Sequence, residues 1–290
     1  MSLSVRPLSE KKGYTIAVRY KTEQLYFLGE RKHMRKDLTE IIFILDRSGS
    51  MSGLERDTIG GFNSMIQQQK RTKGDALIST VVFDNVSEVL HDRISVKDIR
   101  PMTIRDYTVR GCTALMDAIG SAVGRIGNVH KYARSDDVPE HTMFVITTDG
   151  VENASCRYSR ERVKQMIQRQ RVKYGWEFIF LGANIDAVGT ATQLGIDQNQ
   201  AVSYRCDSEG ITMNYEVISD AINAVRGGVS LGKDWKRIID EDYKKRSSFL
   251  EFTAVKLVNR DGKIYVNLDG KKLGSSAIVN NLTGGAALLI

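Results

Sequence analysis

The chain has 290 residues, 41% of them hydrophobic and 27% charged, which is typical of a folded globular protein and unlike a disordered or fibrous one. Its formal charge of +7 is modest and is not gathered into a long Lys/Arg run, so the composition does not require a nucleic-acid partner. No apolar run approaches the ~20 residues of a membrane-spanning helix, and no N-terminal apolar core marks a signal peptide. We therefore expect a cytoplasmic protein that does not contact a membrane.

The first 33 residues carry their own pattern. Residues 14–20 alternate apolar and polar side chains, as a half-buried strand does, and residues 24–28 could form a second strand after a short turn. Residues 23–29 also partly match a protease-cleavage tag, and His33-Met34 matches a common cloning junction. Residues 1–33 are therefore either a native hairpin or appended sequence.

The central part of the chain, residues 34–246, alternates strand and helix patterns. The run Ile41 to Leu45 is typical of a strand buried on both faces. In chain order we then expect a helix over 54–70, a hairpin of strands 76–83 and 86–94, a helix over 114–126, a strand over 142–147, a helix over 159–174, a strand over 177–181, a helix over 187–194, a strand over 201–204, and helices over 212–225 and 233–245. This order predicts an α/β domain with a doubly wound, mostly parallel sheet, helices on both faces and one antiparallel edge strand.

The last part of the chain, residues 247–290, changes to a β pattern. Short apolar strands flank Asp261-Gly262 and Asp269-Gly270, which are both hairpin-turn dipeptides. The C-terminal segment and the 1–33 segment each contain too few strands to form a stable sheet alone. We predict that the two chain ends pair into one small β-module, which would bury Ile16, Val18, Val255, Leu257, Ile264 and Val266.

Three cysteines, odd in number and far apart, favour neither a disulfide framework nor a zinc cluster. Small apolar residues of this kind are usually found in the interior. We therefore expect Cys112, Cys156 and Cys206 to be reduced and buried.

The most informative stretch follows the first central strand. Asp46, Ser48 and Ser50 stand at alternate positions in one loop, so three oxygens can turn to the same side. Oxygen ligands suit a hard cation such as Mg²⁺, and open α/β sheets bind ligands at strand ends. The alternative is a plain strand-to-helix turn, because Asp, Ser and Gly are common turn residues.

Two later stretches repeat this pattern. Thr113 stands at the start of a predicted helix, shortly after Gly111, and Asp149 ends a buried strand before Gly150. Taken singly, Thr113 is also a good helix N-cap, and Asp149-Gly150 is also an ordinary turn. Together with the first loop they give three hydroxyls and two carboxylates, all at strand ends or helix starts.

In this order and context, the three stretches resemble the von Willebrand factor A domain with its metal-ion-dependent adhesion site, over about residues 36–245. The closest likeness is to intracellular bacterial members of that family. The resemblance implies that Asp46, Ser48, Ser50, Thr113 and Asp149 hold Mg²⁺ or Mn²⁺. It also implies a non-enzymatic interaction module, in which an Asp or Glu of a protein partner supplies the last metal ligand.

The sequence leaves two other functions open. The same loops could serve a metal-assisted phosphoester hydrolase, although none of the four histidines lies in a metal-loop motif. The cations of the 160–173 helix could bind nucleic acid weakly, but they spread around the helix, so a solvated face is the simpler interpretation. Gly227 to Lys233 spells GxxxxGK, but Asp234 replaces the Ser/Thr of a phosphate-binding loop and the segment follows a helix, so we interpret it as a turn.

Overall fold

A computed structural model of the chain describes residues 34–252, 256–260, 263–268 and 271–272, with side chains described to residue 247. The chain divides into two compact units, of which the first ends at Ile239 and the second begins at Asp240. The predicted strands at 14–20 and 24–28 lie outside the described residues.

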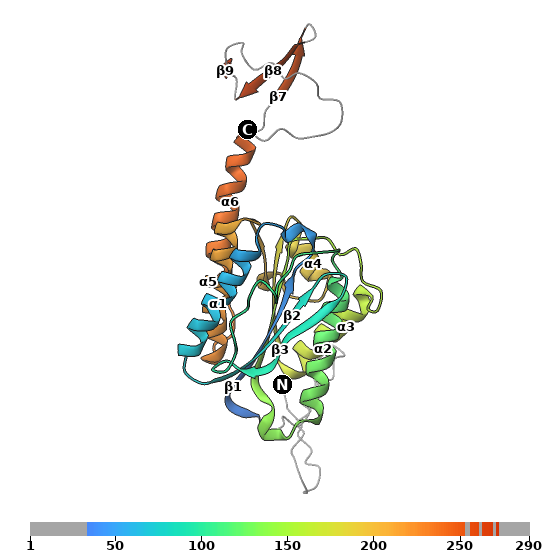
Figure 1. Cartoon of the computed structure of the whole chain (residues 1–290), viewed down its shortest axis with the longest axis vertical. Helices are drawn as coiled ribbons and strands as arrows, with labels where there is room; N and C mark the ends of the chain where they lie inside the picture. The colour runs from blue at the N-terminus through green and yellow to red at the C-terminus, as the bar shows by residue number, and fades with distance from the viewer. Residues whose placement is uncertain (1–33, 253–255, 261–262, 269–270, 273–290) are drawn as a thin grey trace, which may run out of the picture. The chain divides into compact units, whose positions relative to one another are not determined.

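The first unit contains a six-stranded sheet in the order β3-β2-β1-β4-β5-β6 (Figure 1). Four of its five neighbouring pairs are parallel, and the edge strand β3 is antiparallel to β2. The strands are β1 (Arg35–Asp46), β2 (Asp75–Phe83), β3 (Ser87–Ser95), β4 (Pro139–Thr148), β5 (Glu177–Ala183) and β6 (Ala201–Tyr204). The predicted doubly wound, mostly parallel sheet with one antiparallel edge strand is confirmed.

Helices cover both faces of this sheet, as the two layers on either side of it in Figure 1 show. One apolar core joins the sheet to α1 (Glu55–Arg71) and α5 (Ser208–Arg226). The other core joins it to α2 (Leu115–Tyr132), α3 (Arg160–Tyr174) and α4 (Ala187–Gln193). The side chains of β1 from Ile41 to Leu45 alternate between the two cores, which explains their unbroken hydrophobic run. No helix in the described part of the chain is long and apolar enough to cross a membrane.

Close helix packing explains the Gly60-Gly61 pair inside α1. A Cβ atom at Gly61 would lie 2.3 Å from the Tyr215 ring of α5, whereas one at Gly60 would meet nothing within 4 Å. Gly61 therefore lets α1 approach α5, and Gly60 only lowers the helix propensity of the segment.

Several predicted boundaries were wrong by one or more turns. Helix α2 continues six residues past the expected end at Ile126, and α5 begins at Ser208 because the Asp207 side chain caps it by accepting a hydrogen bond from Gly210 N at 2.8 Å. The expected helix over 233–245 is a 3-10 turn (η4, Lys233–Lys236) followed by α6 (Arg237–Phe252). Residues 227–232 of the GxxxxGK segment connect α5 to η4, and Lys233 begins η4, which agrees with the turn interpretation.

The described strands of the second unit form a small antiparallel sheet. Strands β7 (Lys256–Arg260) and β8 (Lys263–Leu268) pair on either side of the predicted turn at 261–262, and β9 (Lys271–Lys272) pairs with β8. The joint module with residues 1–33, and the domain boundary at 246/247, stay predictions.

Candidate metal centre

The five residues expected to hold a metal come together at the carboxyl edge of the sheet. Asp46 ends β1, and Asp149 follows the end of β4; β1 and β4 are direct neighbours, with Leu45 opposite Thr147. Thr113 lies two residues before Leu115, where α2 begins. The parallel pairing of two neighbouring strands thus brings together residues that are 103 positions apart in the chain.

Main-chain hydrogen bonds fasten the loops of this centre to one another. Gly49 N donates to Gly111 O at 3.0 Å, and Arg110 N donates to Arg47 O at 2.9 Å. Thr113 N donates to the Asn153 side chain at 2.9 Å, and Asn153 N donates back to Thr113 O at 3.1 Å. The three segments that carry the predicted residues are therefore joined to one another by hydrogen bonds.

A continuous chain of short contacts joins four of the five side chains. Thr113 Oγ1 lies 3.1 Å from Ser48 Oγ, which lies 3.1 Å from Ser50 Oγ. Ser50 Oγ in turn donates to Asp149 Oδ1 at 2.6 Å. Three hydroxyl oxygens and a carboxylate oxygen thus face one another, an arrangement suited to a hard cation.

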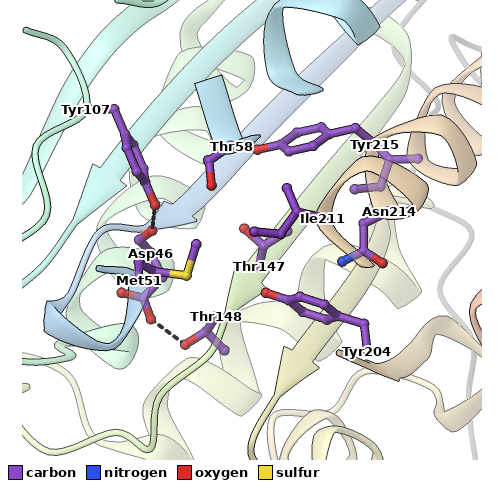
Figure 2. Close-up of a pocket in the computed structure, with 11 residues that line it drawn as sticks. Asp46, Met51, Thr58, Tyr107, Thr147, Thr148, Tyr204, Ile211, Asn214 and Tyr215 are labelled. Atoms are coloured by element: carbon purple, nitrogen blue, oxygen red, sulfur yellow. Dashed lines mark hydrogen bonds between the residues drawn. The ribbon is translucent and has the colours of Figure 1, made fainter. Parts of the chain in front are cut away.

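Asp46, the fifth residue, is held next to these contacts by three hydrogen bonds. Its Oδ1 accepts from Ser48 N at 2.7 Å, and its Oδ2 accepts from Thr148 Oγ1 at 2.6 Å. The Tyr107 hydroxyl donates to the Asp46 main-chain oxygen (Figure 2). Sequence reasoning missed Thr148 and Tyr107. The Thr147-Thr148-Asp149 run hinted at Thr148, but only the strand register shows which threonine faces Asp46.

The two carboxylates are buried without a cation beside them. Asp46 and Asp149 are each 2% exposed, and neither forms an ion pair with any residue that the structure describes. Burial raises the pKa of both carboxyl groups above its usual value, although hydrogen bonds from Thr148 to Asp46 and from Ser50 to Asp149 oppose that shift. The Asp149 charge raises the pKa of Asp46 further. A bound dication would compensate both charges.

Two glycines keep the centre open. A Cβ atom at Gly150 would lie 2.7 Å from Thr113 Oγ1, so any larger residue would push into the hydroxyl group of the site. Gly111 has a φ of +71°, and a Cβ atom there would lie 2.1 Å from Asn85 Oδ1. An added Cβ atom would therefore crowd Thr113 at position 150 and Asn85 at position 111, where the backbone conformation also favours glycine.

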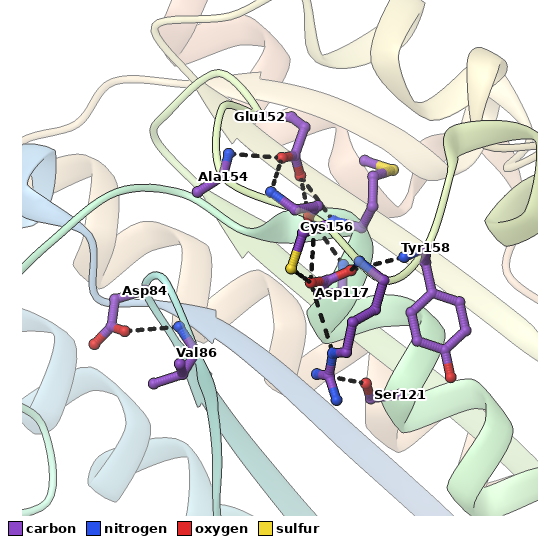
Figure 3. A network of polar contacts seen from close by, with 11 residues as sticks. Asp84, Val86, Asp117, Ser121, Glu152, Ala154, Cys156 and Tyr158 are labelled. Atoms are coloured by element: carbon purple, nitrogen blue, oxygen red, sulfur yellow. Dashed lines mark hydrogen bonds and ion pairs between the residues drawn. The ribbon is translucent and has the colours of Figure 1, made fainter.

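A second layer of polar contacts fixes the loop after β4 to the start of α2 (Figure 3). The buried Asp117 carboxylate accepts hydrogen bonds from the main-chain N–H groups of Cys156, Arg157 and Tyr158 at 2.8–3.0 Å. These bonds outweigh burial and lower the pKa of Asp117. Glu152 accepts from Met116 N at 2.9 Å and from Ser155 N at 2.7 Å. Both carboxylates position the loop, and nothing in the sequence singled them out.

A buried arginine supports the other side of the first loop. Arg47 donates to Asp84 Oδ2 at 3.0 Å and to Glu88 Oε2 at 2.9 Å, and its side chain is only 4% exposed. Arg110 donates to the same Asp84 oxygen at 2.8 Å. Burial raises the pKa of Asp84, but the Arg110 bond, the Val86 N–H and the Arg47 charge together lower it. Asp84 is thus neutralised inside the protein, unlike Asp46 and Asp149.

The cysteines correct one expectation. Cys112 and Cys156 are exposed because they lie in the loops around the centre, and only Cys206 is partly buried. The Cys206 thiol donates to Asp149 Oδ2 at 3.6 Å, and burial together with the Asp149 charge raises its pKa to about 12. Two of the histidines pack elsewhere: His91 lies against Thr80, and His130 lies against Glu40.

The donor atoms of the five side chains are of the kind that binds a divalent cation. Two carboxylates and three hydroxyls supply only oxygen donors, which are the ligands that hard cations prefer. No group of three or more His, Cys, Asp or Glu suited to a metal ion occurs within the described residues. A metal at this centre would thus depend on Ser48, Ser50 and Thr113 as well as on the acids.

Comparison with known proteins finds similar structures but no similar sequences. No family model and no curated protein matches the chain. Among solved structures, the von Willebrand factor domain of the type V pilus tip protein Mfa5 from Porphyromonas gingivalis matches with a TM-score of 0.50 and 12% identity, over 67% of this chain and 97% of that domain. A variant of the PilB minor pilin from Streptococcus sanguinis matches with a TM-score of 0.50 and 11% identity, over 72% of this chain and 66% of that protein.

Other matches cover only part of a longer protein. The pilus adhesin SpaC from Lactobacillus rhamnosus GG matches with a TM-score of 0.50 and 9% identity, and the match covers 66% of this chain but 30% of SpaC. The chain spans 47% of proximal thread matrix protein 1 from the mussel byssus, at 12% identity and a TM-score of 0.44. At these identities the likeness concerns the fold alone. The first unit therefore has a fold of the von Willebrand factor A type.

Proposed function

We propose that the chain is a protein-interaction module whose metal centre binds one Mg²⁺ or Mn²⁺ and takes an Asp or Glu of a protein partner as the last ligand. The observation that carries this proposal is the contact chain from Thr113 through Ser48 and Ser50 to Asp149, with Asp46 beside it. It combines two buried carboxylates that form no ion pair with a described residue and three hydroxyls that contact one another and, through Ser50, Asp149.

The number of ligands in the centre leaves room for a partner carboxylate. Two carboxylates neutralise a dication, and the hydroxyls contribute oxygen ligands without further charge. Mg²⁺ prefers six oxygen ligands, so five protein side chains leave room for one more. Ser50 is exposed to solvent while Ser48 is buried, so a partner would approach from the Ser50 side.

Metal binding is tested by calorimetry with Mg²⁺ and Mn²⁺ on the whole chain. We expect one site in the wild type and none after Ser48→Ala or Asp149→Asn. Asp98→Ala is the matched control, because Asp98 is an exposed aspartate away from the centre. Equal metal binding by the Asp149→Asn variant and the control would contradict the assignment.

Partner binding is tested by capture from the source cells with Mg²⁺ or with EDTA. We expect a protein that is retained only with Mg²⁺, and that is lost from the Asp149→Asn variant under both conditions. A partner that binds equally well in EDTA would remove the metal from the interaction. Phosphatase activity that is lost with Asp46→Asn would instead support the hydrolase alternative.

A role in nucleic-acid binding is the weaker alternative, because two of the α3 cations have partners within the protein. Arg160 donates to Gln193 at 2.7 Å, and Arg171 donates to Gly195 O at 2.5 Å. Duplex binding that falls steeply with added salt would restore that alternative. The cytoplasmic location stays a prediction, which fractionation of the source cells checks.

A further inference from the structure

An arginine side chain faces solvent beside the candidate metal centre. Arg110 stands three residues before Thr113, and Arg110 N donates to the main-chain oxygen of Arg47, in the first loop of the centre, at 2.9 Å. The Arg110 side chain is 58% exposed, although its Nε donates to the buried Asp84 carboxylate at 2.8 Å. One edge of the Arg110 guanidinium is therefore anchored to the protein, while much of the side chain faces solvent.

The contacts around Asp84 leave part of the hydrogen-bonding capacity of Arg110 unused. Asp84 Oδ2 also accepts from Arg47 Nε at 3.0 Å, and Asp84 Oδ1 accepts from Val86 N at 2.9 Å (Figure 3). Glu88, whose charge also acts on Arg110, is bonded to Arg47 Nη1 at 2.9 Å. The two terminal nitrogens of Arg110 donate to no residue within the described part of the chain. Because their N–H groups lie in one plane, they can bind an external carboxylate through two parallel hydrogen bonds.

The short stretch between Arg110 and Thr113 leaves both residues within reach of one ligand. Gly111 and Cys112 are exposed, and Gly111 has no side chain that could stand between the arginine and the centre. Cys112 N donates to Asn85 Oδ1 at 2.8 Å, which ties this stretch to the turn between β2 and β3. A single segment of a partner can thus lie across Gly111 and contact both the metal centre and Arg110.

We propose that Arg110 is a second contact point for the partner, which presents two acidic residues close together in its sequence. One of them binds the metal, and the other binds the Arg110 guanidinium. This inference rests on the proposed function, because the first acid is the partner ligand of the metal. It adds the class of segment that the centre recognises, one with two neighbouring carboxylates, and it makes Arg110 a residue that determines specificity.

The test measures the binding of synthetic peptides to the whole chain in saturating Mg²⁺. The probes are Gly/Ser heptapeptides that carry one Asp, or two Asp separated by one, two or three residues, which spans roughly 7–13 Å in an extended chain. We expect at least one two-Asp peptide to bind the wild type about two- to fivefold more tightly than it binds Arg110→Gln, the gain that an exposed ion pair usually gives. The one-Asp peptide should bind both proteins equally.

Arg169→Gln is the matched control, because it makes the same change of charge at an exposed arginine of α3. It should bind every peptide as the wild type does. Chemical denaturation checks that Arg110→Gln is folded, which we expect because Arg47 and Val86 still hold Asp84.

The outcomes separate this inference from the proposed function. If calorimetry finds no metal site, or if the peptides bind equally well in EDTA, the proposed function fails and this inference fails with it. If the metal binds but Arg110→Gln weakens the one-Asp and two-Asp peptides equally, or weakens neither, the metal site stands and this inference is wrong. A metal-loaded protein that binds none of the two-Asp peptides would also overturn it.

Discussion

Strand β1 carries two buried acidic residues, Glu40 and Asp46, which differ in whether a cationic side chain pairs with them. Glu40 is completely buried, and its carboxylate pairs with Arg93 at 2.9 Å and with His130 at 2.5 Å. Asp46, six residues further along, accepts hydrogen bonds from an N–H group and a hydroxyl group and forms no ion pair within the described part of the chain. Glu40 thus has a cationic partner within the protein, Arg93, whereas Asp46 forms no ion pair with any residue that the structure describes.

This difference separates a structural site from a binding site. A buried carboxylate needs a compensating charge or several hydrogen bonds. Where the protein supplies the cation, as at Glu40 and at Asp84, no ligand is required. Where it supplies hydroxyls and a second acid, as at Asp46 and Asp149, the proposed external cation would complete the group.

The largest change in stability is expected from removing the ion pair between Glu40 and Arg93. Glu40→Gln leaves Arg93 without its buried counter-ion, and removing one member of a buried pair costs about 3–5 kcal/mol. Because the Arg93 side chain is 20% exposed, we expect the lower end of that range. Chemical denaturation measures the loss, and calorimetry should show unchanged metal affinity. Lost metal binding in a folded Glu40→Gln protein would contradict the division between the two sites.

Asp46→Asn should change metal binding and leave stability almost unchanged, the opposite of Glu40→Gln. We expect metal binding to disappear, while the metal-free protein keeps its stability or gains about 1 kcal/mol, because a buried charge has been removed. Denaturation in EDTA and in Mg²⁺ measures both effects. A large loss of stability in EDTA would show that Asp46 holds the fold together as Glu40 does.

The dependence of stability on pH should also depend on metal. Because the folded-state pKa values of Asp46 and Asp149 are raised, their folded forms bind protons more readily than the unfolded chain. Their contribution to stability is therefore fully present below the unfolded pKa and is lost as pH rises through the raised values.

We expect metal-free wild type to gain stability relative to Asp46→Asn as pH falls from neutral toward 3.8, the ordinary value for Asp. Saturating Mg²⁺ should remove this gain, because the metal holds both carboxylates ionised. Parallel pH series of the two proteins, each with EDTA and with Mg²⁺, measure the difference. Identical slopes in all four series would contradict the expectation.

The smallest effect should come from adding one methyl group. Gly150→Ala places a Cβ atom 2.7 Å from Thr113 Oγ1, so we expect weaker metal binding with little loss of stability. A shift of one ligand should lower metal affinity about tenfold, the lower end of the effect of disturbed ligand positioning. Gly60→Ala is the matched control: it meets nothing within 4 Å, and it should raise helix stability by about 0.5–1 kcal/mol without changing metal affinity.

Much of this comparison could be foreseen from the sequence. The apolar run from Ile41 to Leu45 marked a strand buried on both faces, and alternating strands and helices marked the doubly wound sheet. The five residues of the candidate centre were predicted from three stretches at strand ends or a helix start and from their resemblance to a family motif, and the structure brings them together. Parallel strands bring such positions to one edge of the sheet.

The remaining parts depend on strand register and loop path, which local patterns do not encode. The pairing of Glu40 with Arg93 and His130 joins three elements, and no short motif marks it. Thr148 is distinguished from Thr147 only by which face of β4 it occupies. The exposure of Cys112 and Cys156 follows from loops that are held by Asn85 and Asp117, not from the chemistry of the thiol.

The central claim is that Asp46 and Asp149 share a divalent cation. Anomalous diffraction from crystals grown with Mn²⁺ tests it most directly. We expect one strong anomalous peak in contact with oxygens of Ser48, Ser50 and Thr113 and close to both carboxylates, and no peak in the Asp149→Asn protein. A wild-type map with no peak at this position, or with its peak elsewhere, would contradict the claim.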